Sequence, residues 1–204
     1  MDSLHTIAVL ASTRGTDLQA LMDAIEQKKL LARLIVICNK ECGALERAKK
    51  HTIPHYLIPS QGKEREAFDK EIAAILDKEK VELIVLIGYM LYLSPWFANR
   101  YRNRIMNIHP SLLPAFAGGM DLNVHEEVLK RGCKISGCTL HFVDEGEDTG
   151  PIILQKAVEV KEQDTAETLK ERVQKAEQEI ILQGIRLFFD GKLQVEGNQV
   201  RILA

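Results

Sequence analysis

Several features that define specialised protein classes are absent from this chain of 204 residues. No apolar run approaches the roughly 18 residues that a membrane-spanning helix needs. The stretch from Met1 to His5 has no positively charged segment followed by an apolar run and a small-residue cleavage site. No repeat or low-complexity segment is present. These absences exclude a transmembrane protein and predict a cytoplasmic one.

An excess of charge of one sign is also missing. The 27 Lys and Arg residues and 29 Asp and Glu residues give a formal net charge of -2. This balance argues against a nucleic-acid partner or a membrane surface. The four cysteines do not have the spacing of a zinc site, so we expect no bound metal. Cys38 and Cys138 lie in apolar runs, where a reduced cysteine is a small core residue.

What is present is an alternation of apolar, β-rich runs with segments of helical spacing. The expected strands cover 6–11, 32–39, 55–58, 82–87 and 104–108, and helices are expected near 18–25, 43–51, 63–78 and from Ser94-Pro95. A helix over 124–130, strands over 134–143 and 151–160, a helix over 164–190 and a hairpin over 193–203 follow. This order predicts an α/β fold with a doubly wound, mostly parallel sheet and a C-terminal β-hairpin. We expect a single domain over 1–204, with halves of about 1–105 and 106–204.

The most suggestive segment is Asn107-Ile108-His109-Pro110-Ser111-Leu112-Leu113-Pro114. Asn107 and His109 are two residues apart, so in an extended strand their side chains point the same way. An amide can donate a hydrogen bond to an oxyanion, and an imidazole can transfer a proton near neutral pH. The alternative is an ordinary hydrogen-bonded pair at a strand end. A catalytic relay would need a carboxylate, and the loop from Asp144 to Pro151 offers four.

The loop Ser12-Thr13-Arg14-Gly15-Thr16-Asp17 joins the first strand to the first helix. A glycine and hydroxyls at a helix N-terminus suit a phosphate, although the same residues also fit a capped turn with no ligand. Thr16 or Asp17 is the expected N-cap. Glu177 falls on or beside the apolar stripe of the last helix. The sequence alone favours a solvent-exposed position for its carboxylate at the edge of the stripe.

Taken together, these motifs resemble the glycinamide ribonucleotide formyltransferases, folate-dependent enzymes of purine biosynthesis with a Rossmann-like fold. The resemblance covers residues 5–203 and is most specific over Asn107–Pro114 and over His141–Gln155. It implies that Asn107 and His109 are catalytic. It also selects Asp148 from the four carboxylates as the catalytic aspartate.

The resemblance also implies the binding residues. Those for the ribonucleotide fall on Gly15, Thr16, Asp17 and Glu177. Those for the folate fall on Met90, Leu91, Tyr92, Leu93, Asp144, Glu145, Gly146 and Glu147. Two positions depart from the commonest family pattern: Asp17 replaces an asparagine and Leu91 replaces an arginine. The loop over 119–123 is longer than in the best-known members.

The implied reaction transfers a formyl group from 10-formyltetrahydrofolate to the amine of glycinamide ribonucleotide, without a metal. The oxyanion would be held by Asn107 and His109, and Asp148 would relay protons. The expected partners are these two small molecules, and the expected oligomeric state is a monomer or homodimer. The alternatives are a formyltetrahydrofolate hydrolase and a formyltransferase for another acceptor, such as an amino sugar nucleotide.

Overall fold

A computed structural model describes residues 4–119 and 122–204 of the chain. It divides into two compact units, Met1–Met106 and Asn107–Ala204. Strand β5 (Ile105–His109) begins in the first unit and ends in the second. The single-domain organisation expected from the sequence stays a prediction. None of the helices in the described part of the chain has the length and apolar character of a membrane-spanning segment.

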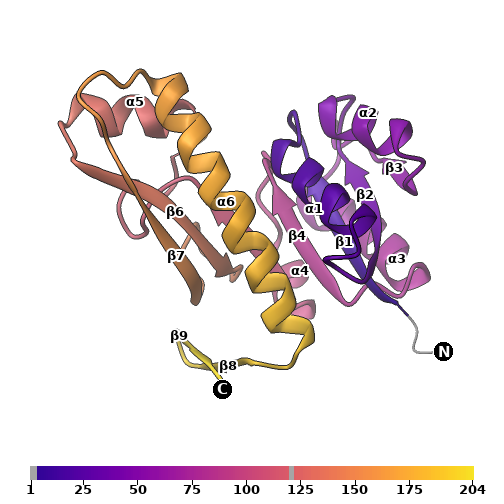
Figure 1. Cartoon of the computed structure of the whole chain (residues 1–204). Coiled ribbons are helices and arrows are strands. Elements are labelled where there is room, and N and C mark those ends of the chain that lie inside the picture. The colour runs from indigo at the N-terminus through magenta and orange to yellow at the C-terminus, as the bar shows by residue number, and fades with distance from the viewer. Residues whose placement is uncertain (1–3, 120–121) are drawn as a thin grey trace. The chain divides into compact units, whose positions relative to one another are not determined.

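The first unit is a parallel sheet with helices packed on it (Figure 1). Its strands are β1 (His5–Ala11), β2 (Ala32–Cys38), β3 (His55–Leu57) and β4 (Leu83–Ile87), and its helices are α1 (Thr16–Glu26), α2 (Gly43–Lys50), α3 (Arg65–Lys78) and α4 (Pro95–Arg100). The strand order is β3-β2-β1-β4. The chain therefore reverses direction across the sheet between β1 and β4. At such a switch point the loops that follow the two strands diverge, which is where open α/β sheets bind ligands.

Burial of apolar strands stabilises this unit. Every residue from Ile7 to Ala11 is fully buried, and β4 is buried along its whole length. Such strands have no solvent face, which explains why their sequences lack polar alternation. Cys38 and Cys138, expected as core residues, are buried free cysteines.

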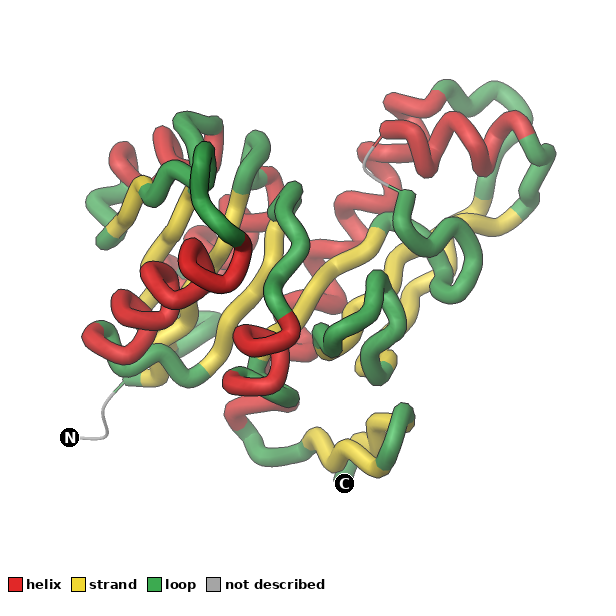
Figure 2. The backbone as a smooth tube through the Cα atoms, turned by 180° about the vertical axis from the view of Figure 1, so that it is seen from behind, coloured by secondary structure: helices red, strands yellow, loops and turns green. Residues whose placement is uncertain are grey.

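The second unit is mainly antiparallel. Strands β6 (Ile135–Phe142) and β7 (Ile152–Glu159) pair antiparallel, and the long helix α6 (Ala166–Phe189) lies along them (Figure 1). Helix α5 (Leu122–Lys130) precedes them. The chain ends in the hairpin of β8 (Leu193–Glu196) and β9 (Gln199–Ile202), seen beside the C-terminus in Figure 2. The predicted strands, helices and C-terminal hairpin are confirmed, with boundaries shifted by a few residues.

One predicted cap is wrong. Helix α1 is capped by Gly15 rather than by Thr16 or Asp17, and no side chain caps it. Gly15 has φ 67°, a left-handed conformation that glycine adopts without the steric cost borne by other residues. A Cβ at this position would lie 2.8 Å from the Cβ of Ala44. The close contact with α2 therefore also requires glycine.

Candidate active site

A polar cluster lies at the end of β5, within the second unit. Asp148 approaches both predicted partners: its Oδ2 is 3.2 Å from His109 Nδ1, and its Oδ1 is 3.4 Å from Asn107 Nδ2. His109 and Asp148 are almost buried, with 4% and 13% of their side chains exposed. The structure therefore brings together Asn107, His109 and Asp148, which are up to 41 residues apart in the sequence.

The His109 ring is held at both nitrogens. Its Nε2 lies 3.1 Å from the Phe116 carbonyl oxygen, which can only accept, so Nε2 carries a hydrogen. Its Nδ1 faces Asp148. Burial lowers the pKa of His109 below its ordinary value, and the negative charge of Asp148 opposes this lowering. Because burial and the charge of Asp148 act on its pKa in opposite directions, the His109 ring can take up a proton beside Asp148 and release it again.

The Asp148 carboxylate is kept charged. Burial by itself would raise its pKa, but the adjacent His141 ring, a hydrogen bond from the Gly118 backbone and the nearby His109 hold the pKa below its usual range. The Gly118 N–H donates to Asp148 Oδ2 over 2.9 Å. Asp148 has φ 53°, a left-handed conformation that aspartate tolerates better than most residues. The backbone thus directs this carboxylate at the two β5 side chains.

The other three carboxylates of the acidic loop have different surroundings. Asp144 Oδ1 accepts from the Gly146 N–H at 3.0 Å and from the Thr149 hydroxyl at 2.7 Å, so it shapes the loop. Glu145 and Glu147 are exposed. Of the four residues that the sequence left open, Asp148 is the one that pairs with His109.

The turn after β5 is fixed by a separate hydrogen-bond network. Thr139 on β6 accepts from the Leu113 N–H at 3.0 Å and donates to the Ser111 carbonyl at 2.7 Å. Gln155 on β7 donates to the Leu113 carbonyl and to Thr139, both at 3.0 Å. These bonds satisfy the backbone groups of the Ser111–Leu113 turn and fix where β5 ends.

Sequence reasoning gave no role to His141. Its ring is buried on β6, and its Nε2 lies 3.1 Å from Asn107 Nδ2 and 3.5 Å from Asp148 Oδ1. It is therefore a fourth member of the cluster. The signal that could have found it is an imidazole in the apolar run that leads into the acidic loop, because a buried histidine needs polar partners.

The loop after β1 is bonded to the loop after β4, within the first unit. The Ser12 hydroxyl donates to Asn39 Oδ1 at 2.7 Å and accepts from the Met90 N–H at 3.0 Å. The Ser12 N–H donates to the Gly88 carbonyl at 3.1 Å. Gly15 and the buried Asp17 lie at the N-terminus of α1, where the helix dipole favours negative charge. Ser12 thus couples the predicted phosphate loop to the predicted folate segment.

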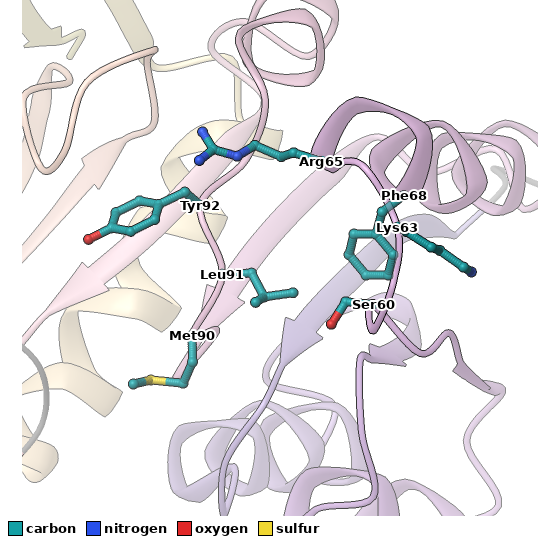
Figure 3. A pocket seen from close by; sticks show the side chains of 7 residues that line it. All are labelled: Ser60, Lys63, Arg65, Phe68, Met90, Leu91 and Tyr92. Atoms are coloured by element: carbon teal, nitrogen blue, oxygen red, sulfur yellow. The ribbon is translucent and has the colours of Figure 1, made fainter.

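Beside that segment is a cavity of about 270 Å³ (Figure 3). It is lined by Ser60, Lys63, Arg65, Phe68, Met90, Leu91 and Tyr92. Leu91 points toward Phe68, whereas Met90 and Tyr92 point to the other side of the segment. The Arg65 guanidinium lies 5.9 Å from the centre of the Tyr92 ring. Three of the four residues in the first predicted folate segment, Met90 to Leu93, therefore line a cavity with a cationic rim.

The solvated position that the sequence favoured for Glu177 is wrong. Only 6% of the residue is exposed, and it lies on the buried face of α6 with Val173 and Ile180. Burying a carboxylate costs free energy because the charged group loses its hydration, so a buried carboxylate needs a group that compensates for this loss. The described residues contain no cluster of three or more His, Cys, Asp or Glu side chains suited to a metal ion.

Comparison with known proteins gives a consistent result. The formyl transferase family matches residues 5–185. Phosphoribosylglycinamide formyltransferase of Escherichia coli (strain K12) is 38% identical over 94% of this chain and 91% of that protein. The crystal structure of glycinamide ribonucleotide transformylase 1 from Symbiobacterium toebii is 40% identical, with a TM-score of 0.93 over 100% of this chain and 96% of that chain.

A second group of relatives is much longer. Trifunctional purine biosynthetic protein adenosine-3 of Bos taurus is 43% identical over 94% of this chain, but the chain spans only 19% of its length. The similarity thus concerns one segment of that protein. The family match and the bacterial relatives, which this chain covers almost completely, show that the chain belongs to the formyl transferase family.

Proposed function

We propose that this protein transfers the formyl group of 10-formyltetrahydrofolate to the primary amine of glycinamide ribonucleotide. The observation that carries the proposal is the buried contact of His109 with Asp148, beside Asn107, in a formyl transferase whose relatives are named for this acceptor. The protein acts in the cytoplasm as a monomer or a homodimer, with these two small molecules as its partners.

The proposed chemistry is direct attack. The amine nitrogen bonds to the formyl carbon and gives a tetrahedral intermediate whose oxygen carries the negative charge. An N–H of Asn107 donates to this oxygen, and protonated His109 adds a second donor when its Nε2 hydrogen moves from the Phe116 carbonyl oxygen to the intermediate. Removing one such donor typically lowers the rate about a hundred- to a thousandfold. The intermediate collapses when the bond from carbon to the folate nitrogen breaks.

Proton movement accompanies this exchange of bonds. The attacking amine must lose a proton, and the leaving folate nitrogen must gain one. Asp148 stays ionised at neutral pH, so it can accept the proton, while His109 beside it can supply one. The lowered pKa of His109 favours release of its proton. The pair therefore acts as acid and base in one turnover.

Most of the proposed binding residues lie in the first unit, and Glu177 lies on α6 in the second. The N–H groups at the start of α1, next to Gly15 and Thr16, bind the phosphate of the acceptor. Because a carboxylate would repel phosphate, we assign Asp17 to the helix terminus rather than to a direct contact. Glu177 binds the ribose hydroxyls. The cavity at Leu91 and Phe68 takes an apolar part of the folate, and Arg65 pairs with a folate carboxylate.

The decisive experiment is an assay of the purified protein with 10-formyltetrahydrofolate, with and without glycinamide ribonucleotide. Release of deformylated folate only when the ribonucleotide is present supports the proposal. Equal release in both samples would replace it with hydrolysis. Release only with an amino sugar nucleotide would assign a different acceptor, and no release from folded protein would reject the formyl transfer.

A further inference from the structure

The His141 ring is fixed at both of its nitrogens. Its Nδ1 lies 2.8 Å from the Phe142 carbonyl oxygen, which can only accept, so Nδ1 carries a hydrogen. Its Nε2 faces the Asn107 amide nitrogen at 3.1 Å and Asp148 Oδ1 at 3.5 Å. Only 2% of the residue is exposed, so water cannot readily replace these partners.

The protonation of this ring and the orientation of the Asn107 amide depend on each other. In neutral His141, Nε2 has a lone pair and accepts one N–H of Asn107. The second N–H of the amide is shared only weakly with Asp148, at 3.4 Å, and is available to a reacting oxygen. In protonated His141, Nε2 carries a hydrogen that Asp148 accepts. Two donors then face each other, and the amide must turn its oxygen toward the ring.

We propose that His141 is a positioning residue: its neutral form holds the Asn107 amide with Nδ2 toward the Asp148–His109 pair, and its protonation turns that donor away and stops transfer. This inference rests on the proposed role of Asn107 as an oxyanion donor. It goes further in assigning the orientation of the amide to a residue that contacts no reacting atom. The consequence is a loss of turnover at acid pH.

Other titratable groups near the His141 ring also affect the pH dependence of turnover. Leu140 packs onto α6, where a Cβ at Gly184 would lie 2.1 Å from its side chain. The partners of the His141 ring lie on β5 and in the acidic loop. The titratable groups that face it are His109 and Asp148, with Glu147 acting on His109. His109 titrates, so any effect of His141 must be separated from it by substitution.

Two substitutions make this separation. His141→Gln keeps an acceptor for the Asn107 N–H but cannot be charged. We expect its kcat at alkaline pH to stay within about tenfold of wild type and its acid decline to move to lower pH. His141→Asn is too short to reach Asn107. We expect kcat to fall about 10- to 100-fold at every pH. Because position 141 is not expected to contact substrate, the KM values for the ribonucleotide and for the folate should stay within about twofold of wild type in both variants.

The matched control is His55→Gln. His55 also has its Nδ1 next to a backbone carbonyl, that of Ile53 at 2.9 Å, but it is exposed on β3. Its substitution should leave the pH profile unchanged. A wild-type acid decline in His141→Gln, or wild-type turnover in His141→Asn, would overturn the inference. Circular dichroism shows whether each variant is folded.

A measurement on the wild-type protein keeps the inference testable if the variants do not fold. The side-chain amide signal of Asn107, identified by its loss in Asn107→Asp, should shift with pH in nuclear magnetic resonance spectra over the range in which turnover declines. A signal that does not move would reject the coupling. The failure of the broader proposal is recognised separately, because full turnover by Asn107→Ala would remove the oxyanion role itself.

Discussion

The two units use buried strands in different ways. In the first unit, the buried parts of β1, β2 and β4 are apolar except for Thr6, and the candidate binding groups lie in the loops after the strands. In the second unit, the candidate catalytic groups lie within the strands: Asn107 and His109 on β5 and His141 on β6. The contrast indicates that candidate binding groups can be placed in loops at strand ends, whereas proton transfer needs buried polar side chains that satisfy one another.

The sharpest test of this contrast compares two aspartates of the same loop. Asp148→Asn removes the charge beside His109, so kcat should fall about a thousandfold, within the range for lost acid–base catalysis. Asp144→Asn keeps an oxygen for Gly146 and Thr149, and its kcat should fall less than about tenfold. Steady-state kinetics measure both. Equal losses would mean that the loop as a whole, and not the charge of Asp148, is what matters.

Substitutions of two glycines test the predicted phosphate loop of the first unit. Gly15 and Gly62 both have positive φ, 67° and 76°, but only Gly15 has neighbours that a Cβ would strike. Each change to alanine should cost about 1–2 kcal/mol of stability for the left-handed conformation. Gly15→Ala should in addition raise KM for the ribonucleotide about tenfold or more, because α1 must shift against α2. If Gly62→Ala has the same effect on KM, the phosphate loop is misassigned.

The cationic rim of the cavity gives a smaller expected effect. Arg65→Ala should raise KM for the folate about tenfold and leave kcat nearly unchanged, because it removes binding that substrate and transition state share. Arg33 is a suitable control, since its guanidinium pairs with Glu79 on the first unit and does not line the cavity. A fall in kcat with unchanged KM in Arg65→Ala would contradict its assignment to binding.

The smallest effect concerns stability against pH. His109 has a pKa below its ordinary value of 6.5, so the folded state binds fewer protons than the unfolded state. The contribution of neutral His109 to the free energy of unfolding is fully present above pH 6.5. It is lost as the pH falls below 6.5 and through the lowered pKa of His109 in the folded state. His109→Gln should reduce this acid sensitivity by up to about 1 kcal/mol between roughly pH 7 and 5, as followed by urea denaturation. An unchanged slope would show that His109 titrates normally.

The acidic loop shows what tertiary structure adds to sequence. The residues alone left its four carboxylates open, and only family resemblance favoured Asp148. The reason is that the backbone conformation of the loop, with Asp148 at φ 53° and Asp144 turned into hydrogen bonds with Gly146 and Thr149, decides which carboxylate meets β5. Local sequence does not encode such a long-range pairing.

The sequence by itself determined the alternation of strands and helices, the buried apolar strands and the pairing of Asn107 with His109 on one face of β5. These follow from hydrophobic periodicity and the two-residue repeat of a strand, which are local properties. Only the tertiary structure decided that Gly15 caps α1, that Glu177 is buried and that His141 joins the cluster. Each of these depends on packing between segments far apart in the chain, which local patterns do not record.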